Sequence, residues 1–324
     1  MASSIFNSEK RVLLALLSAI AVIIPLGVVN IVIHLDTASG RDGTIAMQKF
    51  FNRKVAPSQK YDMVFLGDSR VLTGINPEFF ERKLNCTAFN AAFTGGGING
   101  EILRHAAEKL LSGNTRAPRS VIIGMTAMSM GESSRRNKSF NQIKSELAAQ
   151  GDGFFSDYIR IPFQKIRSKH FKNLFKNEKP ATVPYDNGYL ERFAVVKKKA
   201  QERSIQTYRI SFHKYKFSQE NLRELIGYVR MWKKENVTVF VFRPPVNPAM
   251  DALENEFGKC DFALIQRIVE ESGGVWLEVD KRETYNSYDS SHLASDEAIR
   301  LSEDLSDKVA AHFRKKTKSL ASQK

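Results

Sequence analysis

The chain alternates short apolar runs with longer segments of helical periodicity. The runs lie at 63–66, 87–93, 120–125, 237–242 and 274–279. The first four end at or near a glycine or proline, as buried strands do, and the last begins after a glycine. Apolar residues recur at helical spacing over 100–111, 219–235, 250–271 and 296–313. Strands that alternate with helices of this length predict an α/β fold, with a mostly parallel sheet that helices cover on both faces.

A longer apolar run, at 12–35, carries no formal charge when its histidine is neutral. About 20 apolar residues cross the hydrocarbon core as a helix, so this run predicts one transmembrane helix. A cleaved signal and a buried core helix are the alternatives, although no small-residue cleavage site follows the run. Lys10 and Arg11 precede it, which places residues 1–11 in the cytoplasm and the following domain outside, in the periplasm or at the cell surface.

Composition divides the rest of the chain. A polar linker at 36–60 precedes an α/β domain at 61–314, and a basic tail at 315–324 is expected to be disordered. Residues from about 134 to 216 interrupt the strand–helix rhythm with many lysines and arginines among aromatic residues. We interpret them as an insertion with a helix at 190–203, either a solvated surface or a basic surface for membrane headgroups or an acidic polysaccharide.

The formal net charge of +14 suits nucleic acid, anionic lipid and anionic polymers alike. No helix-turn-helix, RNP-like or zinc-finger pattern accompanies it, so no nucleic-acid partner is expected. The two cysteines, Cys86 and Cys260, match no metal-ligand spacing; free buried thiols are preferred to a disulfide. The glycines at 95–100 satisfy a dinucleotide pattern, but no acidic residue ends the next strand. Neither a cofactor nor a metal ion is expected.

Three residues with catalytic potential fall in loops at the carboxyl ends of strands. Ser69 follows the glycine that ends the first strand, and Asp289 and His292 lie between the last strand and the final helix. For each motif alone there is a non-catalytic alternative. Ser69 could cap a helix, and the segment from Asp289 to His292 could be an exposed loop or a helix cap. The loops at the carboxyl ends of the strands, however, gather at one edge of an open parallel sheet. The order of the three residues along the chain and their shared place at strand ends therefore predict Ser69 as nucleophile, His292 as general base and Asp289 as the carboxylate that orients the imidazole.

Gly67-Asp68-Ser69 after a strand, and Asp-x-x-His before the last helix, resemble the first and last blocks of the SGNH (GDSL-like) hydrolase superfamily. The resemblance implies a three-layer, flavodoxin-like fold. It also implies an oxyanion hole, for which the Ser69 backbone and the turn at 90–95, with Ala92 and Gly95, are the candidates. The family's third block supplies an asparagine, but here Thr126 occupies the matching region. The loss of one oxyanion donor can cost about 100- to 1,000-fold in rate, so either Thr126 or another group substitutes or activity is weak.

The chain is similar to membrane-anchored SGNH-like proteins of cell-surface acylation, such as those of teichoic-acid D-alanylation and alginate O-acetylation. The features in common are the expected anchor, the divergent third block and the basic outer domain. That likeness implies an acyl-Ser69 intermediate, transfer to a polysaccharide or other surface polymer, and a membrane-bound O-acyltransferase as partner. An extracytoplasmic esterase or deacetylase is the alternative. A catalytically weak scaffold that binds polysaccharide or a membrane acyltransferase is another.

Further candidates for contacts with a substrate lie beside the predicted site. Arg70 follows the nucleophile directly, and Asn90 begins the predicted oxyanion turn. Arg243 ends a strand at the same edge of the sheet and is predicted either to contact an anionic acceptor or to pair locally.

Overall fold

The computed structural model describes residues 45–95, 97–113, 117–149 and 182–322. The transmembrane helix expected at 12–35 and the expected cytoplasmic residues 1–11 lie outside these ranges, as does part of the expected insertion. Within the described ranges, no helix is both long enough and apolar enough to cross a membrane.

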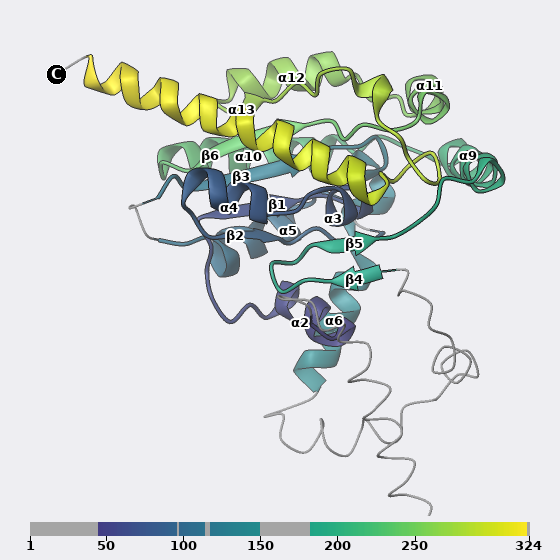
Figure 1. The fold of residues 1–324 in the computed structure, drawn as a ribbon, viewed down its shortest axis with the longest axis horizontal. Helices are drawn as coiled ribbons and strands as arrows, with labels where there is room; N and C mark the ends of the chain where they lie inside the picture. Colours follow the sequence, from purple (N-terminus) through teal and green to yellow (C-terminus); the bar gives the residue numbers. More distant parts are fainter. Residues whose placement is uncertain (1–44, 96, 114–116, 150–181, 323–324) are drawn as a thin grey trace, which may run out of the picture. The chain divides into compact units, whose positions relative to one another are not determined.

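A parallel five-stranded sheet forms the centre of the described chain (Figure 1). Its strands are β1 (Met63–Leu66), β2 (Ala88–Asn90), β3 (Ser120–Gly124), β6 (Thr238–Phe242) and β7 (Val275–Trp276). They lie in the order β2-β1-β3-β6-β7, which is the flavodoxin-like order. This confirms the predicted α/β class and the parallel sheet. The strand order reverses between β1 and β3, where open α/β sheets form their ligand crevice.

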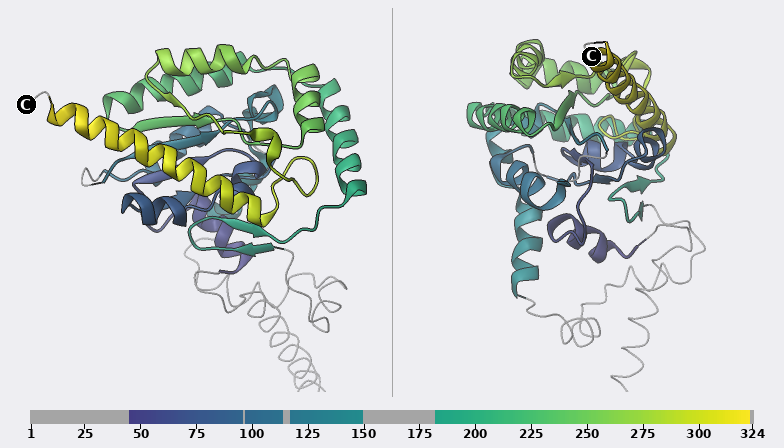
Figure 2. Two further views of the ribbon diagram at one scale, coloured as in Figure 1. Left: turned by 45° about the horizontal axis from the view of Figure 1, so that its top comes forward. Right: turned by 90° about the vertical axis from the view of Figure 1, so that its left-hand side faces the viewer.

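Helices cover both faces of the sheet (Figures 1 and 2). On one face Val64 and Val121 share an apolar cluster with residues of helices α5 (Gly100–His105), α10 (Gln219–Lys234) and α12 (Phe262–Glu271), and a π-helical turn (Ala106–Leu110) continues α5. On the other face lie α3 (Ser69–Gly74), α4 (Glu78–Leu84) and α13 (Ser295–Ala321). There Phe65 meets Phe80, and Phe240 meets Phe313. Alternate strand residues therefore face opposite layers, as the pleat requires.

The remaining elements lie around these layers. They are α2 (Met47–Val55), α6 (Lys138–Ala149), α9 (Lys198–His213), α11 (Pro248–Phe257), the antiparallel hairpin β4 (Thr182–Pro184) and β5 (Leu190–Arg192), and 3-10 turns at Met128–Met130, Glu132–Arg135 and Arg282–Thr284.

Several element boundaries differ from the prediction. The helix expected at 190–203 was wrong at its start, because residues 190–192 pair with β4 as β5 and α9 begins only at Lys198. The single helix expected at 250–271 is two, α11 and α12. Lys259 takes a left-handed backbone (φ 43°) between them, and the Asp261 carboxylate caps α12 by accepting from Leu264 N.

The two ends of the expected domain also differ from the prediction. Helix α2 forms inside the expected linker, with Phe50 and Lys54 fully buried, so the packed unit begins before residue 61. The expected disordered tail is helical as far as Ala321, because α13 meets no glycine or proline there. Both cysteines are free thiols, as expected, but half-buried.

Candidate active site

Ser69 begins α3 directly after the turn that ends β1. Gly67 takes a positive φ of 154°, and a Cβ there would lie 2.4 Å from Val71 Cγ2 and 2.9 Å from Gly124 O. Only glycine fits this close approach. Asp68 then caps α3, because its Oδ1 accepts from Arg70 N at 2.9 Å. The sequence Gly-Asp-Ser therefore sets the turn, starts the helix and places Ser69 at the carboxyl edge of the sheet.

His292 lies within hydrogen-bonding distance of both Ser69 and Asp289. Its Nε2 is 2.8 Å from Ser69 Oγ, and its Nδ1 is 2.9 Å from Asp289 Oδ2 and 3.1 Å from Oδ1. Two carboxylate oxygens beside Nδ1 favour the tautomer with its proton there, which leaves Nε2 to accept the serine proton. The structure thus brings together the three side chains that the sequence predicted to share a site.

Asp289 also holds the backbone of its own loop. Its Oδ1 accepts from Ser291 N at 3.0 Å and from His292 N at 2.8 Å. Burial would raise the pKa of Asp289, but the hydrogen bonds and charge of His292, together with these backbone N–H groups, hold that pKa below its ordinary value. Asp289 is thereby kept as the carboxylate that an imidazolium needs beside it.

The loop between Asp289 and His292 is closed like a small hairpin. Tyr288 N donates to His292 O at 2.9 Å, and Ser287 bridges Leu293 in antiparallel fashion. Between the two catalytic candidates Ser290 adopts a left-handed backbone with φ 70°, and its carbonyl accepts from Asn247 N at 3.1 Å. A non-glycine residue in this conformation costs about 1–2 kcal/mol, so the surrounding contacts must hold the loop in place.

Two predicted oxyanion groups are already hydrogen-bonded. The Ala92 backbone N–H donates to Asn90 Oδ1 at 3.1 Å, and the Thr126 hydroxyl donates to Asp68 Oδ2 at 2.6 Å. Both hydrogen bonds would have to break before either group could stabilise an oxyanion as predicted. Gly95 is exposed and left-handed, with φ 65°. The Ser69 N–H lies in the first turn of α3, where backbone N–H groups lack partners within the helix.

Asn90 and Arg70, two of the predicted substrate contacts, point into the protein and bond to groups of the chain itself. Asn90 is fully buried, and its Nδ2 donates to Val71 O and Ile75 O, both at 2.8 Å. It therefore ties the end of β2 to α3, with no group left for a substrate. Arg70 is also buried and forms an ion pair with Glu254 at 2.6 Å.

Arg243 forms ion pairs with nearby residues, which is one of the two alternatives predicted for it. Its Nη2 lies 2.9 Å from Asp251 and 3.1 Å from Glu254, and its guanidinium covers the Phe262 ring at 4.2 Å. Sequence reasoning missed Glu254 and Tyr208 beside this site. No local pattern marks either residue, and only its place in the fold brings it there.

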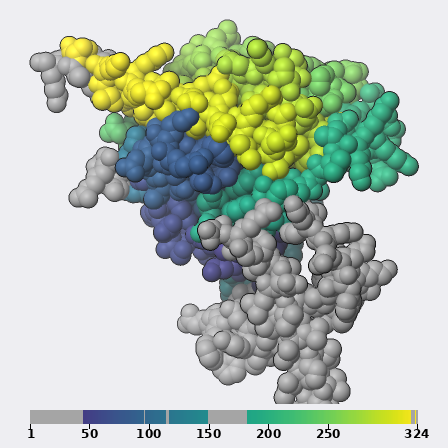
Figure 3. All heavy atoms as spheres, in the orientation of Figure 1, coloured from purple at the N-terminus to yellow at the C-terminus, as the bar shows by residue number. Residues whose placement is uncertain are grey.

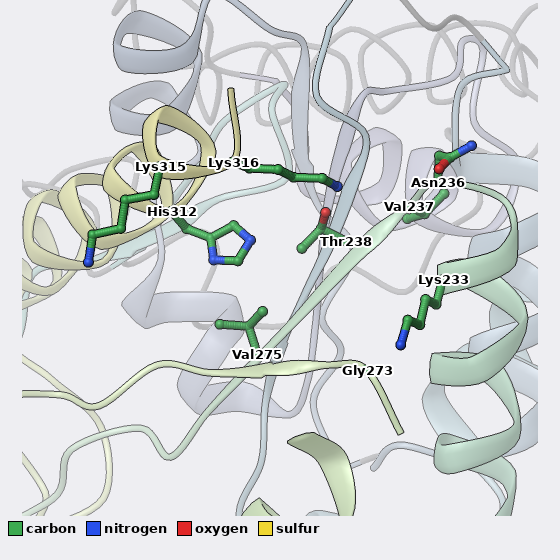
Figure 4. A pocket seen from close by; sticks show the side chains of 9 residues that line it. All are labelled: Lys233, Asn236, Val237, Thr238, Gly273, Val275, His312, Lys315 and Lys316. Carbon is green, nitrogen blue, oxygen red and sulfur yellow. The ribbon is translucent and has the colours of Figure 1, made fainter. Parts of the chain in front are cut away.

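A hollow lies at the opposite, amino-terminal edge of the sheet (Figure 4). It encloses about 460 Å³, and its lining, which contains no carboxylate, comprises Lys233, Asn236, Val237, Thr238, Gly273, Val275, His312, Lys315 and Lys316. Without a carboxylate to orient His312, this hollow cannot assemble the Ser–His–Asp arrangement of the carboxyl edge. Across the described ranges, no cluster of three or more metal-ligating side chains occurs.

Comparisons with known proteins were made for the whole chain. No family model matches it, and no curated protein matches it. Among solved structures, a lipase/acylhydrolase from Enterococcus faecalis is similar at 12% identity and a TM-score of 0.38, over 77% of this chain and 96% of that chain. A likeness of this size assigns no activity, so the chemical interpretation rests on the contacts of Ser69, His292 and Asp289.

Proposed function

We propose that this protein is a serine-dependent acyl hydrolase or acyltransferase that works through an acyl-Ser69 intermediate. The observation that carries the proposal is the chain of contacts from Ser69 Oγ to His292 Nε2, at 2.8 Å, and from His292 Nδ1 to Asp289, at 2.9 Å. A hydroxyl, an imidazole and a carboxylate in this order are the parts that nucleophilic acyl chemistry requires.

The reaction follows from the same atoms. Ser69 Oγ bonds to the acyl carbonyl carbon while its proton passes to His292 Nε2, and the carbonyl oxygen becomes an oxyanion. Collapse of this intermediate breaks the bond to the leaving oxygen, which takes the proton from Nε2. In the second half, water or a sugar hydroxyl gives its proton to His292 Nε2 while its oxygen bonds to the acyl carbon. The bond from that carbon to Ser69 Oγ then breaks, and Oγ takes the proton back from Nε2. The Asp289 carboxylate stabilises the imidazolium in both halves.

We further propose that the acceptor is a hydroxyl of a cell-surface or exported polysaccharide. Support comes from the apolar run at 12–35, which would anchor the domain on the outer side of a membrane, and from the resemblance to anchored SGNH-like acylation proteins. A membrane-bound O-acyltransferase would then supply the acyl group. The exposed basic residues of segment 192–216 fit an anionic surface or polymer nearby; they are Arg192, Lys197, Lys198, Lys199, Arg203, Arg209, Lys214 and Lys216.

The first test is covalent labelling of the full chain in detergent micelles by a fluorophosphonate. Labelling is expected in the wild type and absent in Ser69→Ala. Ser211→Ala, which removes an exposed serine hydroxyl on α9, serves as the control and should label like the wild type. Equal labelling of wild type and Ser69→Ala would overturn the assignment of the nucleophile.

The second test separates hydrolysis from transfer. With an activated acetyl ester as donor, the release of the leaving group is measured with and without added polysaccharide. Transfer predicts faster release with the polymer and acetyl groups on its hydroxyls, whereas an esterase releases acetate at the same rate in both.

One observation favours a catalytically weak scaffold as a second candidate. The Thr126 hydroxyl is bonded to Asp68, and the Ala92 N–H is bonded to Asn90, so two expected oxyanion donors are engaged. A scaffold predicts that the wild type binds polysaccharide but does not react with the fluorophosphonate, under conditions where a control serine esterase does.

A further inference from the structure

Side chains from three separate parts of the chain meet at Ser291, inside the loop that carries Asp289 and His292. Arg70 Nε donates to Ser291 Oγ at 3.0 Å, and Ser291 Oγ donates to Tyr208 OH at 2.9 Å. Ser291 is fully buried, so its hydroxyl depends on these two partners. The bonds join the nucleophile's neighbour, the catalytic loop and helix α9.

Arg70 is a fixed donor because other contacts hold its guanidinium. Its Nη2 forms an ion pair with Glu254 at 2.6 Å, and both side chains are at most 3% exposed. The guanidinium carbon also lies 5.8 Å from the centre of the Tyr208 ring. A buried, paired guanidinium presents its N–H groups in a rigid plane, so it can set the position of Ser291 more narrowly than a surface side chain can.

Helix α9 reaches the catalytic loop at a second point. Gln201 lies on the same helix, and its Nε2 donates to Ser287 O at 2.8 Å. Ser287 is the residue that bridges Leu293 to close the loop. Figure 3 shows the surface of α9 next to the start of α13, which follows this loop. Both sides of the loop are therefore tied to α9, which belongs to the segment that interrupts the α/β rhythm.

We propose that Tyr208, Ser291 and Arg70 form a positioning chain that aligns His292 with Ser69. This inference rests on the proposed function of Ser69, and it assigns to α9 a role as a brace for the catalytic loop. None of the three side chains exchanges a proton with substrate. They act through His292, because Ser290 is strained and the loop needs outside contacts to keep its shape.

The size of the effect follows from the geometry of proton transfer. His292 Nε2 can take the serine proton only within hydrogen-bond reach, and a displacement of about 1 Å can cost about 100-fold in rate. Loss of the Tyr208 hydroxyl removes one of the two partners of Ser291, so we expect a smaller shift and about a 10-fold slower reaction. Loss of the Ser291 hydroxyl should slow it by about 10- to 100-fold.

The test measures the rate of fluorophosphonate labelling of the full chain against pH. Tyr208→Phe and Ser291→Ala should lower the plateau rate, and the double variant should be no slower than Ser291→Ala alone, because both remove the same connection. Thr207→Ala, one position away on α9, removes an exposed hydroxyl that donates to Arg203 O within the same helix and should keep the wild-type rate. Wild-type plateau rates in both Tyr208→Phe and Ser291→Ala would overturn the proposal, and so would additive effects.

Arg70→Lys separates alignment from folding. Lysine keeps a positive charge beside Glu254 but lacks the Nε–H group that donates to Ser291 Oγ. The variant should therefore fold, and the fluorophosphonate should label it about 10-fold more slowly than the wild type. If Arg70 served folding alone, Arg70→Lys would change the melting temperature without a change in the plateau rate, which would overturn its positioning role.

A readout without chemistry keeps this inference distinct from the proposed function. The ring nitrogens of His292 are observed by nitrogen NMR, with His292→Gln for assignment. Tyr208→Phe and Ser291→Ala should change the Nδ1–H and Nε2 signals even if wild-type Ser69 fails to label. A silent wild type would count against the proposed function, whereas unchanged His292 signals would overturn the positioning chain.

Discussion

The two edges of the sheet each carry a histidine, and the two histidines have opposite surroundings. At the carboxyl edge, His292 contacts a hydroxyl on one ring nitrogen and a carboxylate on the other. At the amino edge, the His312 ring packs edge-on against Phe240 and lies in a hollow with three lysines (Figure 4). Burial lowers the pKa of His312, and Lys316 and Lys315 lower it further.

The comparison shows that neighbours decide what an imidazole can do. A carboxylate beside Nδ1 orients the ring and stabilises the charged form that proton transfer creates. Burial and nearby lysines do the reverse, since they disfavour the charged form of the imidazole. The same residue type therefore has the contacts of a general base at one edge and those of a packing residue at the other.

The largest expected effect comes from exchanging each histidine for glutamine. His292→Gln should slow labelling of Ser69 by at least about 10⁴-fold, because it removes the base. His312→Gln should leave the rate unchanged, and the fluorophosphonate assay measures both. A comparable loss in the two variants would abolish the distinction between the edges.

Next in size is the effect of breaking the buried ion pair between Arg70 and Glu254 at the carboxyl edge. Glu254→Gln leaves Arg70 without its buried countercharge and should lower the free energy of unfolding by about 3–5 kcal/mol. Urea unfolding of the full chain measures the change. Glu256→Gln, at an exposed position of the same helix, should stay within about 0.5 kcal/mol of wild type. Equal stabilities for the two variants would show that Arg70 needs no buried partner.

A third prediction concerns Lys54, whose ammonium lies among backbone carbonyls near the end of β2. Its Nζ donates to Asn90 O and, at 2.8 Å, to Gly188 O, and burial lowers its pKa well below 10.5. Between the lowered pKa and 10.5, only the unfolded chain holds the proton. Stability should therefore rise with pH in that window, by about 1.4 kcal/mol per pH unit.

The Lys54→Met variant lacks this dependence, so its difference in unfolding free energy from wild type should change steadily as the pH approaches 10.5. Lys49→Met, at an exposed position of the same helix, should show a constant difference. A constant difference for Lys54→Met as well would mean that Lys54 titrates alike in both states.

The smallest effect is expected at the amino edge. The double change Lys315→Gln and Lys316→Gln should raise the pKa of His312 without restoring its ordinary value, because burial remains. A proton NMR titration of the histidine rings follows this directly. The rate of Ser69 labelling should not change. A slower rate would show that charges at the amino edge influence the reactivity of Ser69.

Much of the fold could be predicted because the apolar runs are short, separate and bounded by glycine or proline. The strands at 63–66, 120–125 and 237–242 were correct to within a residue. Errors arose where tertiary contacts outweigh local pattern. Residues 190–192 became a strand through pairing with β4, and α2 formed where a polar linker was expected because Phe50 and Lys54 find a buried place.

The candidate site could be predicted in part because strand-end loops gather at one edge of a parallel sheet. Ser69, Asp289 and His292 were found this way. The oxyanion groups and substrate contacts were less predictable, because a polar side chain has several partners within reach after folding. Asn90 and Arg70 turned inward to α3 and Glu254, and the Thr126 hydroxyl bonded to Asp68.

The sequence by itself determined the α/β class, the glycine turn before Ser69 and the order of the serine, the carboxylate and the histidine, since these depend on local spacing and on backbone sterics at Gly67. Tertiary structure alone decided which residues surround them. Tyr208 and Ser291 are 83 positions apart, and Arg70 and Ser291 are 221 apart, yet each pair shares a hydrogen bond. Contacts over such separations arise only when packing brings distant segments together, so no local pattern in the chain announces them.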